Sequence, residues 1–244
     1  MAFEGAGHLP NNRDGEPAEP RRLPRQRRGM TPQMHGRYPD HDVLAQSDRW
    51  DEQTRSVVMG RLHAPAYRYF QQEQIETLEA FCDAIMAQDE DPRIEVLRYV
   101  DHNLSEERGT GHRYADMPDD GETWRTVARG LDETAAEVAG CGFSGLDAET
   151  RDAVIGRFAD GSLRDGAWSE LSPAHAWSVV TGAIVTAFYA HPWAWNEIGF
   201  GGPGYPRVYM RLGPNQREPW EGAEARELVG DFQHDVESDP GMAP

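Results

Sequence analysis

The sequence predicts an all-α protein, a compact bundle of about six or seven helices with an ordered loop near the C-terminus and a disordered N-terminal tail. Apolar residues recur at three- and four-residue spacings in successive segments, which is typical of amphipathic helices. Several of these segments begin at a capping residue or stop at glycine. No alternation typical of strands extends beyond a few residues, and neither a long repeat nor a heptad pattern is present.

By composition the chain divides into a tail, one helical domain and a short C-terminal segment. Residues 1–36 are rich in Gly, Pro, Asn and Arg and have almost no periodic apolar positions, so we expect disorder there. The basic sequence RRLPRQRR at 21–28 is a solvated tail or contacts the protein's own acidic surface, a partner or anionic lipid. A single helical domain is expected over 37–237, and residues 238–244 form a frayed terminus.

The first half of the domain shows four helical patterns. Ser47 precedes the first, and the Gly140-Cys141-Gly142 sequence ends the fourth. Their apolar positions are, in order, Trp50, Thr54, Val57, Val58 and Leu62; Ile75, Leu78, Phe81, Cys82 and Ile85; Ile94, Leu97, Val100 and Leu104; and Trp124, Val127, Leu131, Ala135 and Val138.

Three further helices follow in the second half. Asp147 is a suitable N-cap for the first, and Ser172 followed by Pro173 is a good start for the second. The apolar positions are Val154, Ile155 and Phe158; then Trp177, Val180, Ile184, Val185 and Phe188, the most apolar set of the chain; and finally Leu228, Val229, Phe232 and Val236.

The segment FYAHPWAWNEIGFGGPGYPRVY, from Phe188 to Tyr209, combines aromatic residues, glycines and prolines more densely than any other. Its prolines fix φ and lack an N–H, and its glycines adopt conformations that other residues avoid, so neither a long helix nor a central strand can continue through it. Disordered segments are poor in aromatic residues. We therefore predict an ordered loop, the aromatic platform, from His191 to Tyr209.

The charge of the chain limits its partners. The formal net charge is −18 and no lysine is present, which argues against nucleic acid, whose binding depends on cationic side chains. Residues 191–214 contain only Glu197 against Arg207 and Arg211, so the platform is nearly neutral. Because Tyr, Trp and Arg are enriched at interface centres, we predict a protein-docking surface with Trp193, Trp195, Tyr205 and Arg207 as anchors. The alternative is that these aromatic residues only cover the helical core.

Chemical motifs are sparse. His191 and Glu197 could form an acid/base or metal pair, and Asp101, His102 and His112 are further possible ligands, but no HExxH motif or other defined ligand spacing is present. We expect His191 to cap the end of the helix that spans Trp177 to Ala190. The glycines at 199–204 lack the context of a nucleotide-binding loop, and no GxSxG motif occurs.

Cysteine usage and hydropathy exclude other classes. Cys82 and Cys141 lie in or beside apolar helical patterns and are expected to be free, buried thiols, because no CxxC or CxxCH motif is present. No run approaches the roughly 20 apolar residues of a membrane span. We expect no cofactor in this chain.

Three segments carry a family resemblance: RYPDHDVLAQSDRWDEQTRSVV at 37–58, QIETLEAFCDAIM at 74–86, and the most specific, YAHPWAWNEIGFGGPGYPRVY at 189–209. With them the chain resembles, over roughly Tyr38 to Leu212, the gluconate 2-dehydrogenase subunit 3 family, the small subunit of flavoprotein dehydrogenase complexes. The residues that match the family motif are His191, Pro192, Trp195, Asn196, Glu197, Gly199, Gly201, Gly202, Pro203 and Tyr205.

The resemblance implies a helical, non-catalytic subunit that supports maturation, stability or export of a large FAD-containing partner of the glucose–methanol–choline oxidoreductase type. That partner would oxidise a sugar, sugar acid or other alcohol and pass electrons to a cytochrome c subunit. A free-standing enzyme with its site at His191 and Glu197, and a structural scaffold, are the alternatives. Many family members have a twin-arginine export signal, whereas Arg21 and Arg22 here precede Leu-Pro-Arg-Gln-Arg-Arg. We therefore expect a cytoplasmic protein, or one exported together with its partner.

Overall fold

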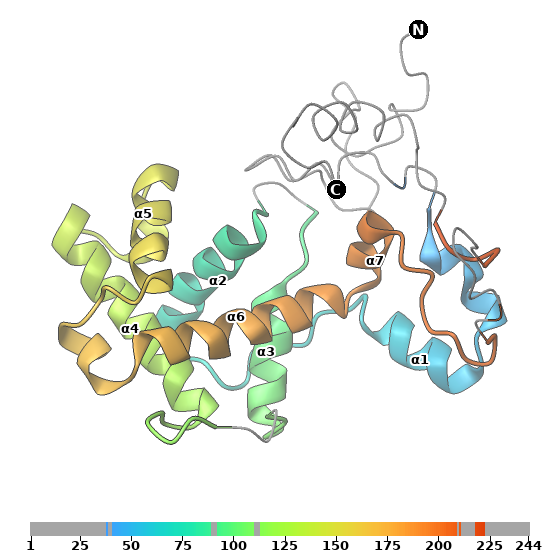
Figure 1. The fold of residues 1–244 in the computed structure, drawn as a ribbon, viewed down its shortest axis with the longest axis horizontal. Coiled ribbons are helices and arrows are strands. Elements are labelled where there is room, and N and C mark those ends of the chain that lie inside the picture. Colours follow the sequence, from blue (N-terminus) through green and yellow to red (C-terminus); the bar gives the residue numbers. More distant parts are fainter. Residues whose placement is uncertain are drawn as a thin grey trace, which may run out of the picture. The chain divides into compact units, whose positions relative to one another are not determined.

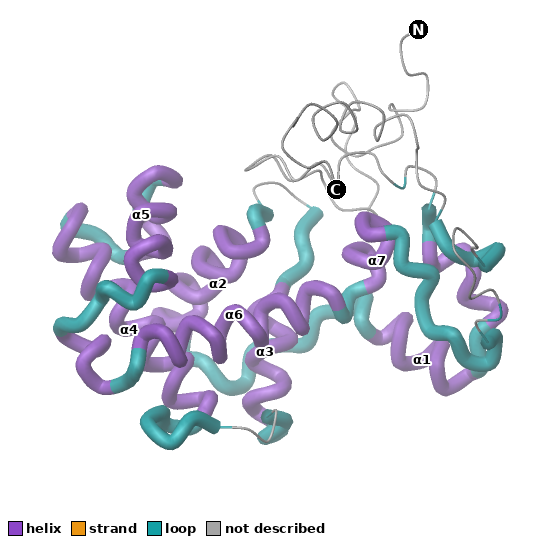
Figure 2. The backbone as a smooth tube through the Cα atoms, in the orientation of Figure 1, coloured by secondary structure: helices purple, strands orange, loops and turns teal. Residues whose placement is uncertain are grey.

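A computed structural model describes Tyr38 and residues 41–88, 92–109, 113–208, 210 and 218–222. These described residues form seven α-helices and three 3-10 helices, with no strand among them (Figures 1 and 2). The all-α prediction is therefore confirmed. The predicted tail at 1–36 and the predicted last helix around Leu228 and Val236 lie outside the described residues. None of the helices in the described ranges has the length and apolar character needed to span a membrane.

The chain divides into two compact units. Unit 2 comprises residues 63–89 and 94–189, and unit 1 comprises residues 1–62, 90–93 and 190–244. Unit 2 contains α2 (Gln72–Met86), α3 (Val96–Ser105), α4 (Asp120–Ala139), α5 (Ala148–Ala159), α6 (Pro173–Tyr189) and the 3-10 helices η4 (Phe143–Gly145) and η5 (Gly166–Glu170). Unit 1 contains the 3-10 helix η3 (Val43–Arg49), α1 (Glu52–Gly60) and α7 (Pro192–Ile198).

The core of unit 2 is built from the apolar positions that the helical periodicity predicts. Within this unit α6 packs against α2, α3, α4 and α5 (Figure 1). Phe81 on α2 is fully buried, and its ring lies 6.0 Å from that of Phe158 and 6.4 Å from those of Phe143 and Trp177. The fully buried side chains at predicted positions include Leu78, Phe81, Trp124, Val127, Leu131, Phe158 and Ile184.

Carboxylates fix the turns of unit 2 by accepting backbone hydrogen bonds. Asp101 on α3 is fully buried and accepts from the N–H groups of Arg68, Tyr69 and Phe70 at 2.7, 2.9 and 2.9 Å. Asp132 on α4 accepts from Phe143 N–H at 2.9 Å. Asp101, a possible metal ligand by sequence, thus holds the chain segment that leads into α2.

Helix caps explain where the helices begin and end. Asp147 caps α5 by accepting from Thr150 N–H at 2.9 Å, and Gly140 ends α4 with φ of +70°, as expected. The expected start of the first helix after Ser47 is wrong, because Ser47 lies within η3 and Asp51 caps α1 through Thr54 N–H at 2.8 Å.

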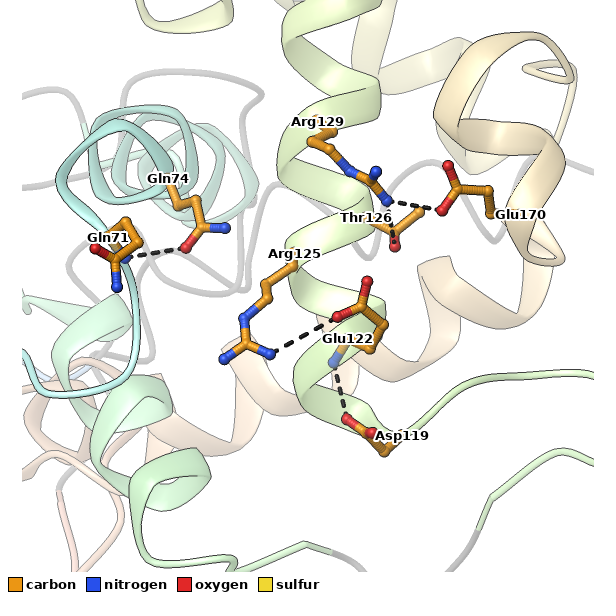
Figure 3. A network of polar contacts seen from close by, with 8 residues as sticks. All are labelled: Gln71, Gln74, Asp119, Glu122, Arg125, Thr126, Arg129 and Glu170. Carbon is orange, nitrogen blue, oxygen red and sulfur yellow. Dashed lines mark hydrogen bonds and ion pairs between the residues drawn. The ribbon is translucent and has the colours of Figure 1, made fainter.

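Charged side chains on the surface of unit 2 also cap a helix and form ion pairs (Figure 3). Asp119 caps α4 through Glu122 N–H at 2.8 Å, and Glu122 pairs with Arg125 one turn further on. Arg129 donates to Glu170 at 2.7 Å. These pairs are solvent-exposed, so each contributes about 0–1 kcal/mol to stability.

Candidate functional site

The aromatic platform lies in unit 1, and part of it is a helix. The expectation of a loop throughout is wrong for Pro192–Ile198, which form α7. Pro192 occupies the first helical position, where its missing N–H has no intrahelical partner to lose and its fixed φ suits the helix. Gly199 ends the helix with φ of +68°. The prolines and glycines therefore limit the helix to seven residues without preventing it.

His191 caps the beginning of α7, whereas its place in the sequence predicts a cap at the end of the preceding helix. Its Nδ1 accepts a hydrogen bond from Trp193 N–H at 3.2 Å, and the two rings meet edge to face with centroids 4.9 Å apart. The Ala190 carbonyl instead accepts from Arg61 Nη1 at 3.2 Å. Burial of the imidazole, reinforced by the Arg61 charge, lowers the pKa of His191 to about 4. His191 is therefore neutral near pH 7, with its Nδ1 lone pair occupied.

The platform packs into a small apolar core. Trp195 on α7 is buried with Val43, Trp50 and Val58, which belong to the N-terminal part of unit 1. Phe200 meets the Trp195 ring edge to face, with centroids 5.4 Å apart and an interplanar angle of 87°. Two segments that are far apart in the sequence thus form one core. Trp195, a predicted docking anchor, contributes to this core.

Two buried polar contacts join the same segments. Asn196 is 4% exposed, and its Oδ1 accepts from the backbone N–H of Val43 at 2.8 Å. His41 Nε2 lies 3.0 Å from the carbonyl oxygen of Phe200 and donates to it. A buried N–H without an acceptor is unfavourable, so Asn196 fixes the position of the chain at the start of η3.

Arg207 holds the glycine-rich loop in place. Its Nη2 donates to the carbonyls of Gly201 and Pro203, both at 3.0 Å, and its Nη1 donates to Gln46. The guanidinium lies 4.6 Å from the centroid of the Trp220 ring. Arg207 is also a predicted docking anchor, and in the structure it fixes the position of this loop within unit 1.

The left-handed glycine Gly202 allows the loop to approach the core closely. Its φ is +76°, and a Cβ at this position would lie 2.8 Å from Val43 Cγ2 and 3.1 Å from the Trp50 ring. Any side chain here would be strained and would clash. The loop thus depends on glycine at this position.

The exposed side chains of this region form what we call the 198–210 strip. The strip comprises Ile198, Phe200, Tyr205, Val208 and Met210, whose exposed fractions are 37, 41, 67, 64 and 78%. Of the predicted anchors only Tyr205 belongs to it, and Trp193 is half-buried. Aromatic and motif residues predict part of this strip, but they do not predict Ile198, Val208 and Met210. The only sign of these exposed positions in the sequence is that they are apolar residues that follow neither a helical nor a strand period.

Unit 1 also differs from unit 2 in charge. Its described residues contain seven Asp or Glu against five Arg, whereas those of unit 2 contain 21 against nine. Ten large apolar side chains are exposed among the described residues, and seven of them lie in unit 1. A nearly neutral surface with exposed apolar side chains is typical of a protein-docking site.

The other residues that the sequence suggests for acid/base chemistry or metal binding do not form one site within the described part of the chain. His191 precedes α7 as its N-cap and Glu197 lies six residues later in the helix, and 3.6 residues per turn places the two positions about 120° apart around the helix axis. His102 lies in the last turn of α3, and His112 lies outside the described residues. Within the described ranges no group of three or more His, Cys, Asp or Glu side chains is placed to hold a metal ion. Cys82 is buried and Cys141 half-buried, both as free thiols.

The all-α fold and the nearly neutral surface of unit 1, which exposes apolar side chains, are those of a helical protein with a candidate docking site for another protein. The family model for gluconate 2-dehydrogenase subunit 3 matches residues 72–204, more than half of the chain. The protein belongs to this family, whose name denotes one subunit of a dehydrogenase complex. The match begins at α2 and ends at Gly204, so it covers the platform from His191 to Gly204 and omits Tyr205 and the segment at 37–58. No curated protein and no solved structure shows significant similarity to the chain.

Proposed function

We propose that this protein is the non-catalytic small subunit of an FAD-dependent dehydrogenase of the glucose–methanol–choline oxidoreductase type. The partner oxidises a sugar, sugar acid or other alcohol, carries the FAD and passes electrons to a cytochrome c subunit. The small subunit supports maturation or stability of the catalytic subunit, and the two assemble in the cytoplasm, so that any export is of the complex. Family membership supports the class of complex.

The observation that carries the proposal is the concentration of exposed apolar side chains on unit 1. Large apolar side chains exposed in this number are costly on a soluble surface unless a partner covers them. The negative charge of unit 2, by contrast, suits contact with solvent. We therefore place the docking surface at the 198–210 strip.

The strip is displayed on a backbone that is already fixed. Asn196, Arg207 and the capped helix α7 hold the chain on which Phe200 and Tyr205 are exposed. Met210 N–H also donates to the Glu218 carboxylate. A pre-organised surface loses little conformational entropy on binding, so more of the contact energy is retained as affinity. Tyr205 is the expected hot spot, and Trp195, Asn196 and Arg207 position it.

Co-purification tests this proposal. The tagged protein is isolated from its native cells, its partners are identified by mass spectrometry, and the visible flavin absorption of the eluate is measured. We expect a flavoprotein of about equal stoichiometry. A colourless preparation without a partner would contradict the proposal, and its metal content would then decide whether the acid/base or metal alternative at His191 and Glu197 merits study.

Matched variants locate the surface. Tyr205→Ala is expected to reduce the co-purified flavin at least tenfold, because truncating a hot spot costs about 2 kcal/mol or more of binding. Val208→Ser tests the strip again, and Val138→Ser is its control, since Val138 is also exposed but lies on α4 in unit 2. Equal flavin recovery with all three variants would remove the 198–210 strip from the docking surface.

A further inference from the structure

The two most exposed methionines of the described residues both lie in unit 1. Met210 is 78% exposed and Met59, on α1, is 39% exposed. The methionines of unit 2 in the same ranges are less accessible, since Met117 is 7% exposed and Met86 is half-buried. Accessible methionine sulfur is thus concentrated in the unit that carries the candidate docking surface.

Met210 belongs to the 198–210 strip and has the largest exposed fraction of its five side chains. Its backbone N–H donates to the Glu218 carboxylate, which fixes the point from which the side chain extends. The unbranched thioether of methionine adapts to irregular apolar surfaces, so it suits a docking contact. That contribution requires the sulfur to stay apolar.

Oxidation of the thioether reverses this polarity. A peroxide transfers one oxygen atom to Sδ as its O–O bond breaks, and hydrogen peroxide then leaves as water. The sulfur loses two electrons to the peroxide, and no proton leaves the side chain. The product, methionine sulfoxide, is polar and is returned to methionine by sulfoxide reductases. Because the reaction needs no neighbouring base, exposure of the sulfur decides where it occurs.

We propose that Met210 is a site of reversible oxidation by peroxides, and that its sulfoxide prevents the unassembled subunit from docking its partner. This inference rests on the proposed function of the strip. The sulfoxide oxygen is a hydrogen-bond acceptor, and its burial against an apolar partner surface without a donor is unfavourable. Docking in turn covers Met210, so the assembled subunit is protected from the same peroxide.

The structure favours Met210 over the other sulfur atoms of the described residues. Met59 has half the exposed fraction of Met210 and lies outside the strip. Cys82 is buried, and burial raises the pKa of its thiol well above the ordinary value, which disfavours the reactive thiolate. Cys141 is half-buried on unit 2. Sulfoxide reductases act on methionine sulfoxide, so they distinguish Met210 from both cysteines.

Peptide mass spectrometry of the purified full-length subunit in dilute hydrogen peroxide measures the oxidation rate at each methionine. We expect Met210 to be oxidised about tenfold faster than Met117, with Met59 between them, because the rate follows exposure. In the complex with the flavoprotein, Met210 should be oxidised about as slowly as Met117. Equal rates at these two residues in the unassembled subunit, or an unchanged rate at Met210 in the complex, would overturn the proposal.

Flavin recovery measures the effect on docking. The tagged subunit is treated with peroxide, cleared of it with catalase, and mixed with the flavoprotein that has been separated from the purified complex. We expect about tenfold less flavin than with the untreated subunit, and methionine sulfoxide reductase should restore the recovery. If the untreated subunit recovers no flavin, the proposed function fails and this inference with it, whereas unchanged recovery after peroxide would overturn this inference alone.

Matched leucine variants assign the effect to one residue. Each variant is compared with its own untreated sample, so that differences in starting affinity do not enter. Met210→Leu has no sulfur at this position, and its flavin recovery should change by less than about twofold after peroxide. Met117→Leu, a volume-conserving change in unit 2, should lose as much recovery as the unmodified protein. Equal losses in the two variants would show that Met210 is not the responsible site.

Discussion

Single polar side chains determine the shape of the candidate docking site. Asn196 and Arg207 donate or accept across segments that lie more than 150 residues apart in the sequence. Each satisfies main-chain or side-chain groups that would otherwise lose their hydrogen bonds with water on burial. The motif residues thus divide into those that hold the backbone, such as Asn196, and those that the backbone presents, such as Tyr205.

His191 makes the stability of unit 1 depend on pH. Its pKa is about 4 in the folded protein and near 6.5 in the unfolded chain, so the unfolded state binds the proton more tightly. The stabilisation is present above about pH 6.5 and is lost as the pH falls toward 4. We expect this residue to lower the free energy of unfolding by up to about 3 kcal/mol over that range.

The variant His191→Asn isolates this contribution. Asparagine can still accept the hydrogen bond at the start of α7 but does not titrate. Chemical denaturation at several pH values, followed by tryptophan fluorescence, should give a shallower dependence between pH 6.5 and 4 for the variant. Identical slopes for the two proteins would show that the imidazole is not held neutral.

At the scale of elements, buried hydrogen bonds from α3 fix the segment that precedes α2. Asp101→Asn keeps the size of the side chain but replaces one acceptor oxygen by an NH₂ group that faces a backbone N–H. We expect the free energy of unfolding to fall by about 2 kcal/mol, because a buried N–H loses its charged acceptor. Urea denaturation measures the change.

Asp147→Asn is the matched control for this substitution. Asp147 caps α5 in full contact with solvent, and asparagine is an equally good N-cap. Its free energy of unfolding should remain close to that of the unmodified protein. If both variants have the same stability, the Asp101 hydrogen bonds contribute little.

Periodicity and caps predicted the helices of unit 2 well because those signals are local. Leu78, Phe81 and Val127 are buried as their spacing indicates, and Gly140 and Asp147 mark the ends that they predict. The helix at Pro192–Ile198 does not follow from the same signals, because proline breaks a helix in its interior but suits its first position, and sequence pattern alone does not distinguish the two.

The candidate site was harder to predict because its arrangement is tertiary. Composition identified the 191–209 segment, but it could not show that Trp195 would be buried against Val43 and Trp50 while Tyr205 would be exposed. Those outcomes depend on contacts with η3 and α1, which no local pattern encodes. The difference in charge between the two units could not be predicted either, because each unit combines segments that are separate in the sequence.

At the scale of the whole molecule, the contrast between the two units predicts how binding responds to salt. If unit 1 docks the partner through the apolar side chains of its described residues, which are nearly neutral in charge, the dissociation constant should change less than threefold between about 50 and 500 mM NaCl, since screening acts on exposed charges. Burial of apolar surface should also give a negative heat-capacity change, measurable by calorimetry at several temperatures.

Docking through unit 2 would give the opposite result. Its described residues carry 21 acidic groups against nine arginines, so a partner held there would be bound by electrostatic attraction. Salt would then weaken the complex by an order of magnitude or more, mainly through a slower association rate. The two units thus predict opposite salt dependences of the dissociation constant. A strong salt dependence would assign the docking surface to the acidic helices of unit 2 in place of the 198–210 strip.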